Sequence, residues 1–170
     1  MKLSAVFSSI LAISAVSATD YSVPVTNDVG LVYTNMLCGT TPCSQTNLYG
    51  QPSYTAFMGN RDYRRILMSF SLADANIDPS SVSSCSLQFP QTADSVTWAV
   101  SPVAGYDAKT VTPATAPMMS NGAAQATGTG KVDITGACQN AVNGVVSVMV
   151  DAYGGPVTIP AGASMLMVDA

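Results

Sequence analysis

The sequence contains no histidine, no glutamate and only one tryptophan. Without histidine, neither Ser-His-Asp nor Cys-His nucleophilic sites can form, because imidazole is the general base in both. Zinc sites built on histidine and catalytic pairs of glutamates are excluded in the same way. Charge is also scarce, since six Lys or Arg accompany ten Asp and give a net charge of −4. Such a chain can neutralise few phosphates, so we do not expect it to bind nucleic acid. Because the usual catalytic bases are missing, we do not expect an enzyme either.

The first 18 residues have the pattern of a secretory signal peptide. Lys2 gives a positive start, an apolar stretch occupies 6–16, and small residues precede a cleavage position after Ala18. This order of features is typical of signal peptides. Residues 19–170 are expected to form a single domain, where no apolar run reaches the ~20 residues of a membrane-spanning helix. We therefore expect a secreted protein, extracellular or in the cell wall, with no membrane partner.

Four cysteines follow the predicted signal peptide, at Cys38, Cys43, Cys85 and Cys138. An even number in a secreted protein favours disulfides, and four cysteines allow three connectivities. Turn residues separate Cys38 from Cys43, which makes a local bridge geometrically easy. We expect this pair together with Cys85–Cys138. A metal site is the competing interpretation, but the spacings lack two close cysteine pairs.

Alternating apolar and polar residues predict short strands. In residues 66–72, Ile66, Met68 and Phe70 fall on one face and serines fall on the other. About eight such strands without long helices are typical of an all-β sandwich. The other expected strands occupy residues 21–25, 29–33, 84–89, 96–100, 131–134, 145–150 and 165–168.

At most one short helix is expected, over residues 136–142. Thr135 is its predicted N-cap, and Asn143-Gly144 is a natural C-terminal stop. Residues 110–130 are rich in Pro, Ala, Thr and Gly, and they predict a long ordered loop at the edge of the sandwich.

The segments also follow a recognisable order. An Asn-Leu-Tyr-Gly element at 47–50 precedes Arg64-Arg65 and the strand at 66–72. The later elements are the turn Ile77-Asp78-Pro79, the strand at 82–89, Thr110-Val111-Thr112-Pro113, Ala116-Pro117, the Val-Asp-Ile-Thr-Gly-Ala-Cys segment at 132–138 and the closing strand.

In this order the chain resembles the DNRLRE-type domain, the group that includes carbohydrate-binding module family 96. The resemblance covers roughly residues 21–170. Pro113 and Asp107-Ala108 stand where the family often has a Trp and an acidic residue, and the cysteines are an addition. The resemblance implies a jelly-roll-like antiparallel β-sandwich and, by analogy, polysaccharide binding.

A sugar-binding surface needs aromatic planes beside hydrogen-bonding side chains, and acidic glycans also favour a cation. Arg61, Arg64 and Arg65 are the one basic cluster of the sequence, arranged as Arg61-Asp62-Tyr63-Arg64-Arg65. Its candidate ligand contacts are Arg61, Tyr63 and Arg64, because cations beside an aromatic ring can bind a carboxylated sugar. In the competing interpretation these arginines pair with Asp62 and other acids at a strand entrance.

Two further aromatic residues are candidate ligand contacts. Tyr106 lies in a Gly-Tyr-Asp turn, and Trp98 is the single tryptophan. The apolar alternation partners Val96 and Val100 favour a core position for Trp98 over a ligand contact, and a packing role is open for each tyrosine.

No cofactor is expected, although a structural calcium ion is an alternative. Calcium takes oxygen ligands from loops. Four aspartates are predicted in loops without forming a calcium-loop motif, namely Asp74, Asp78, Asp107 and Asp151.

The leading hypothesis is a non-catalytic protein that binds an extracellular or cell-wall polysaccharide. The alternative is a structural wall, matrix or filament protein that assembles through sheet edges. A lyase that uses Tyr63 and Arg64 is the third hypothesis.

Overall fold

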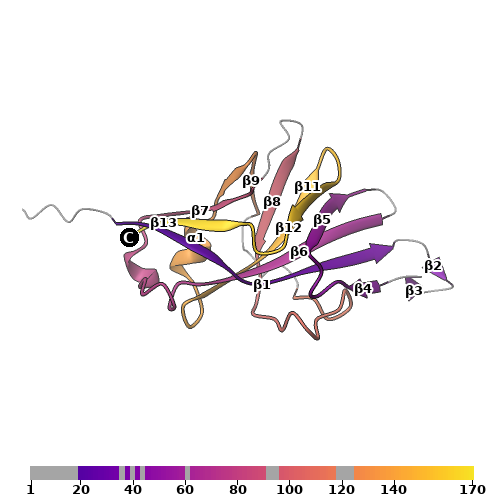
Figure 1. Cartoon of the computed structure of the whole chain (residues 1–170), viewed down its shortest axis with the longest axis horizontal. Helices are drawn as coiled ribbons and strands as arrows, with labels where there is room; N and C mark the ends of the chain where they lie inside the picture. Colours follow the sequence, from indigo (N-terminus) through magenta and orange to yellow (C-terminus); the bar gives the residue numbers. More distant parts are fainter. Residues whose placement is uncertain are drawn as a thin grey trace, which may run out of the picture.

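Antiparallel strands dominate the computed structural model, which describes residues 19–34, 37–38, 41–42, 45–59, 62–90, 96–117 and 125–170 (Figure 1). One short α-helix, α1 (Thr135–Gln139), and one 3-10 turn, Pro79–Ser81, occur in these residues. The all-β sandwich with at most one short helix, predicted from the alternation and the family resemblance, is confirmed. The strands are β1 (Asp20–Thr34), β2 (Leu37–Cys38), β3 (Thr41–Pro42), β4 (Gln45–Asn47), β5 (Ser53–Met58), β6 (Asp62–Ser71), β7 (Ser84–Gln88), β8 (Thr97–Pro102), β9 (Ala126–Gly128), β10 (Lys131–Asp133), β11 (Val145–Tyr153), β12 (Val157–Pro160) and β13 (Met165–Asp169).

The long strand β1 belongs to both layers of the sandwich. Its first part pairs with β13, and its second part pairs with β6 after a register shift between Val25 and Asn27. A bulge of this kind bends a strand and increases its twist. The two strands expected at 21–25 and 29–33 are therefore one bent strand, which runs from beside the C-terminus across the molecule (Figure 1).

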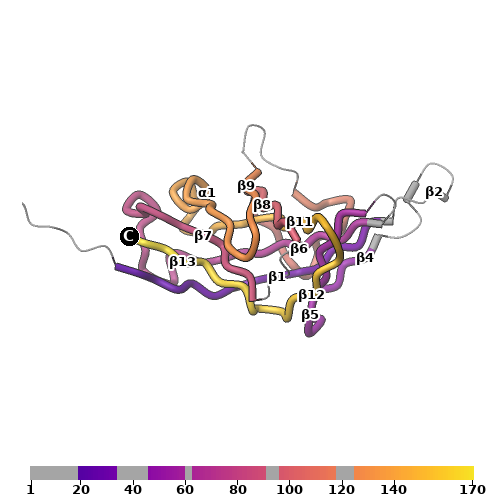
Figure 2. Tube along the Cα trace, turned by 90° about the horizontal axis from the view of Figure 1, so that it is seen from above, coloured from indigo at the N-terminus to yellow at the C-terminus, as the bar shows by residue number. Residues whose placement is uncertain are grey.

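The main sheet closes almost into a barrel. Its strand order is β10-β7-β13-β1-β6-β11-β8-β9. Because β9 and β10 are joined by only Thr129-Gly130, the two ends of this order meet at one side. A further pair, β5 with β12, continues from β6, as Figure 2 shows from above.

The principal core lies between the two layers. It includes Ile66, Met68 and Phe70 of β6, as the alternation predicted. The Cys85–Cys138 disulfide, also as predicted, joins β7 to α1 within this core, with the two Cα atoms 6.4 Å apart. The expected Cys38–Cys43 bridge lies outside the described side chains, and the predicted signal peptide lies outside the described residues.

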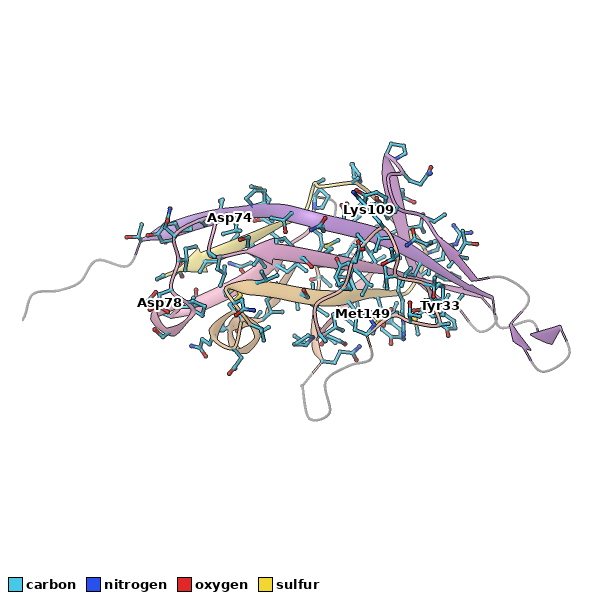
Figure 3. All side chains as sticks on the ribbon, turned by 90° about the horizontal axis from the view of Figure 1, so that it is seen from below. Tyr33, Asp74, Asp78, Lys109 and Met149 are labelled. Carbon is cyan, nitrogen blue, oxygen red and sulfur yellow. A yellow bond between two sulfur atoms is a disulfide. The ribbon has the colours of Figure 1, made fainter. Side chains whose placement is uncertain are left out.

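A second apolar cluster covers the outer face of the β1–β6–β11 layer. Val29, Leu67 and Met149 contribute from the strands, and Val103 and Val111 contribute from the segment after β8. The central strands are consequently buried on both faces, which explains the nearly continuous apolar run at the start of β11. Figure 3 labels Met149 and Tyr33, which lie toward the same end of this layer.

Several local predictions need correction. The helix begins at Thr135 and ends at Gln139, and Ile134 occupies the N-cap position without a side-chain cap. Thr135 instead hydrogen-bonds to β7, because its hydroxyl accepts from the Cys85 amide at 2.9 Å. Asn143 and Gly144 form the turn that leads into β11, since both have positive φ angles of 53° and 72°. The segment expected to be a loop at 110–130 contains β9, which pairs with β8.

No helix in the described part of the chain has the length and apolar content needed to cross a membrane.

Candidate functional site

Two tyrosines stack on the outer face of the sheet, near the end of β1. Tyr33 of β1 and Tyr63 of β6 are direct cross-strand partners. Their ring centroids are 4.5 Å apart and their planes differ by 16°. Both residues are partly exposed. Aromatic pairs placed in this way on one face of a sheet stabilise the strands.

An ion pair lies beside the stacked rings. Arg65 Nε of β6 donates to Asp151 Oδ1 of β11 at 2.9 Å. The guanidinium carbon is 5.6 Å from the centroid of Tyr33 and 5.2 Å from that of Tyr63, within the range of a cation–π interaction. We call Tyr33, Tyr63, Arg65 and Asp151 the tyrosine–arginine cluster.

Asp151 is 3% exposed, so its charge depends on its partner. Burial raises the pKa of the Asp151 carboxyl, while the adjacent Arg65 guanidinium acts in the opposite direction. A buried carboxylate is tolerated when a cation and a hydrogen bond compensate for its lost hydration. Burial likewise raises the pKa of the Tyr33 hydroxyl.

The cluster combines partly exposed aromatic rings with directional hydrogen-bonding groups. A guanidinium has five N–H donors, and the contact between Arg65 Nε and Asp151 uses one of them. Sugar rings have the matching chemistry, because their apolar C–H faces are bordered by hydroxyl groups. The arrangement is therefore suited to stacking and hydrogen bonding.

Strand alternation separates the residues that the sequence analysis placed in one basic cluster. Tyr63 and Arg65 belong to the outer face, while Arg64 is exposed on the opposite face, where its register partners are Val32 and Phe57. Arg61 lies outside the described residues. Of the predicted trio, Tyr63 alone belongs to the tyrosine–arginine cluster.

Trp98 does not reach the surface. It is 1% exposed, and its ring stacks on Phe89 with the centroids 4.0 Å apart and an interplanar angle of 10°. The ligand-contact interpretation of Trp98 is corrected accordingly, because a ring enclosed in the principal core has no face free for a sugar.

Tyr106 packs in the segment after β8. Its hydroxyl donates to the Asn27 carbonyl at 3.2 Å, and its ring contacts the second apolar cluster. Burial raises the pKa of this hydroxyl well above the ordinary tyrosine value. These contacts hold the segment against the sheet, and Tyr106 is not part of the tyrosine–arginine cluster.

Tyr33 and Asp151 were not among the predicted ligand-binding residues. Tyr33 follows Val29 and Leu31 in alternation and could have been assigned to the same face. Asp151 was expected in a loop as a calcium candidate, but it is the seventh residue of β11. An aspartate near the end of an apolar run indicates a buried ion pair, because a charged side chain is seldom buried without a partner.

The other calcium candidates have local roles or stand alone. Asp78 accepts from the Ser80 amide at the 3-10 turn, and Asp107 accepts from the Lys109 amide. Among the described residues, no three acidic, Cys or His side chains come together as a metal site would require.

A separate apolar groove lies between α1 and the end of β8, and we call it the α1 groove. Its volume is about 870 Å³. It is lined by residues within 100–105, 133–143 and 145–147, and by Ala126. Most of these side chains are Val, Ala, Pro or Gly, and none belongs to the tyrosine–arginine cluster.

Comparison with known proteins does not place the chain in a family. No family model matches the sequence, and no curated protein matches it. The resemblance to the DNRLRE-type domain consequently remains a prediction from the order of the segments.

Proposed function

We propose that the protein is a non-catalytic carbohydrate-binding protein that recognises an extracellular or cell-wall polysaccharide through the tyrosine–arginine cluster. The observation that carries the proposal is the partly exposed, stacked Tyr33–Tyr63 pair with the Arg65 guanidinium beside both rings. The predicted signal peptide and the resemblance to a carbohydrate-binding group support it from the sequence.

The charges of the cluster favour a neutral glycan. Arg65 is paired with Asp151 at 2.9 Å, so the guanidinium has little net charge to offer a carboxylated sugar. Arg64, which was predicted to bind a carboxylated sugar together with Tyr63, belongs to the opposite face of the sheet. A neutral polymer of hexose units uses the aromatic plane and the remaining N–H donors without needing a net charge.

The strand edges give less support to a structural protein that polymerises through its sheets. In the described chain, every strand with a partner on one side only is four residues long or shorter. The edge strand β12 also follows Pro156 and ends in Pro160. Short edges and prolines are features that prevent pairing between molecules.

A pull-down with insoluble polysaccharides tests the proposal. Purified protein is incubated with cellulose, chitin and mixed β-glucan, and with an acidic polymer such as pectate, and the bound fraction is measured against polymer concentration. We expect binding to at least one neutral polymer. The Tyr63→Ala change is expected to weaken it about tenfold or more, since stacking contributes roughly 1–3 kcal/mol per aromatic contact.

Tyr49→Ala is the matched control. Tyr49 is exposed in the turn after β4, and it is not part of the stacked pair. The proposal fails if no polysaccharide is retained, or if Tyr49→Ala and folded Tyr63→Ala reduce binding equally. Circular dichroism and the thermal midpoint of each variant establish that it is folded.

A further inference from the structure

The α1 groove gathers apolar surface that the described part of the chain leaves uncovered. Val142, 73% exposed, and Val145, 38% exposed, both line it. Its deeper part is formed by core residues, including Val100, Ile134 and Val146, each of which is at most 4% exposed. The groove therefore leads from these exposed valines to the principal core.

The wall on the α1 side is held by several independent contacts. The disulfide fixes Cys138 to β7, and the Thr135 hydroxyl accepts from the Cys85 amide. After α1, the turn at Asn143-Gly144 packs against Ala73. A wall anchored at both ends keeps its shape, and most small-molecule sites are largely preformed in this way.

The opposite wall is anchored to β11. The Val103 amide donates to the Ser147 carbonyl of β11 at 3.0 Å. The groove's volume of about 870 Å³ falls in the ~300–1,000 Å³ range typical of sites for small molecules.

The charges of the lining decide between classes of ligand. Among the described residues that line the groove, Asp133 is the one ionisable group, and there is no lysine or arginine. The Asp133 carboxylate already accepts from the Thr135 amide and hydroxyl at 2.9 and 2.7 Å. An anionic head group would face this carboxylate, and no Lys or Arg belongs to the described lining, since Lys131, which acts on Asp133, lies outside it. Asn140 and Asn143 on the rim instead offer amides, which suit a neutral hydroxyl.

We propose that the α1 groove binds an uncharged lipid alcohol, with its hydrocarbon chain on the apolar lining and its hydroxyl at the asparagine rim. This site is separate from the tyrosine–arginine cluster and does not depend on the proposed glycan binding.

The experiment compares three ligands that share one chain and differ in the head group. The uncharged dye Nile red reports occupancy of the groove by fluorescence. 1-Dodecanol, dodecanoate and dodecylamine compete for it at pH 7, below the solubility limit of the alcohol and below the micellar concentrations of the two charged amphiphiles. We expect 1-dodecanol to displace the dye at a concentration at least tenfold lower than dodecanoate or dodecylamine.

Two variants fill the groove and a third is the control. Gly105 and Gly136 line it, and a Cβ added at either residue meets no heavy atom within 4 Å. Gly105→Trp and Gly136→Trp are expected to weaken dye binding at least tenfold. Gly155→Trp, at an equally open glycine outside the groove, is expected to leave dye binding unchanged.

Several outcomes overturn the proposal. Absence of dye binding, or equal binding by folded Gly136→Trp and Gly155→Trp, shows that the groove is not the site. Tighter binding of dodecylamine or dodecanoate shows that a charged head group is preferred. A dimer in sedimentation velocity that dissociates in Gly136→Trp shows that a second copy of the chain occupies the groove. Polysaccharide retention by the same variants is measured separately, so a failure of one site is not mistaken for failure of the other.

Discussion

Arg65 and Asp151 form a cross-strand ion pair that is buried on its acidic side. Arg65 Nε lies 2.9 Å from Asp151 Oδ1, and the side chains are 26% and 4% exposed, respectively. The net contribution of such a pair to stability is small, because the attraction mainly offsets the loss of hydration. Removal of one partner alone is costly, since it leaves the other charge buried and unpaired.

The first prediction is that Arg65→Met destabilises the fold by about 3–5 kcal/mol. The double variant Arg65→Met/Asp151→Leu is expected to recover most of this loss, because no unpaired charge remains. Urea unfolding at neutral pH measures the three free energies. Arg64→Met, at the exposed residue next along β6, is the control and is expected to change stability by about 0.5 kcal/mol or less. Equal losses in the single and double variants would contradict the argument.

The second prediction concerns pH. Burial raises the pKa of Asp151 above its ordinary value of 3.8, so the folded protein holds this proton where the unfolded chain has lost it. The resulting stability is fully present below pH 3.8 and is lost as the pH rises through the folded-state pKa. The wild type should therefore lose stability relative to Asp151→Asn as the pH rises through this window. Urea unfolding of both proteins at closely spaced pH values measures the difference. A wild type that gained stability relative to Asp151→Asn as the pH rose would show that Arg65 outweighs burial.

The strand pattern of this protein was readable from the sequence because alternation has a local cause. Ile66, Met68 and Phe70 face the principal core, and the period of two follows from the geometry of any strand. The Cys85–Cys138 pair was likewise predictable, since the local bridge predicted between Cys38 and Cys43 would leave these two as partners.

The candidate site was less predictable because it joins distant parts of the chain. Tyr33, Tyr63 and Asp151 meet only through the register of β1, β6 and β11, which no short sequence window contains. Arg64 and Arg65 are neighbours in the sequence, yet strand alternation places their side chains on opposite faces of the sheet. Trp98 was a candidate ligand contact because it is the single tryptophan, but its apolar neighbours in the strand indicated the core position that the structure shows.

The third prediction follows from the neutral character of the Arg65–Asp151 pair. Binding of a neutral glycan is expected to change by less than about twofold between roughly 50 and 500 mM NaCl, because salt screens interactions between net charges. Retention on the neutral polysaccharide at the two salt concentrations measures this, with pectate in parallel. Strong loss of retention at high salt would indicate that an unpaired cation, and not the tyrosine stack, holds the ligand.

The fourth prediction concerns the long-range disulfide. Cys85 and Cys138 are 53 residues apart, and closing a loop of that length stabilises a fold by about 4 kcal/mol in the chain-entropy treatment. The Cys85→Ala/Cys138→Ala variant is expected to lose roughly this amount in urea unfolding. Because the bridge also holds α1 against β7, the variant should bind Nile red more weakly even under conditions where it remains folded. Unchanged stability would show that packing alone holds α1 in place.

The fifth prediction is that Gly144→Ala destabilises the protein by about 1–3 kcal/mol. Gly144 has a φ of 72°, and a Cβ there would lie 2.8 Å from Ala73 Cβ. The Gly144 carbonyl also accepts from the Leu72 amide at 2.8 Å, so the turn cannot move away without loss of that bond. Gly105→Ala is the matched control, because its φ is outside the left-handed range and its Cβ would meet nothing within 4 Å. The control should be neutral or slightly stabilising, since alanine reduces the freedom of the unfolded chain. Equal thermal midpoints for the two variants would show that the contact with Ala73 relaxes at little cost, and the turn would then not be a fixed wall of the α1 groove.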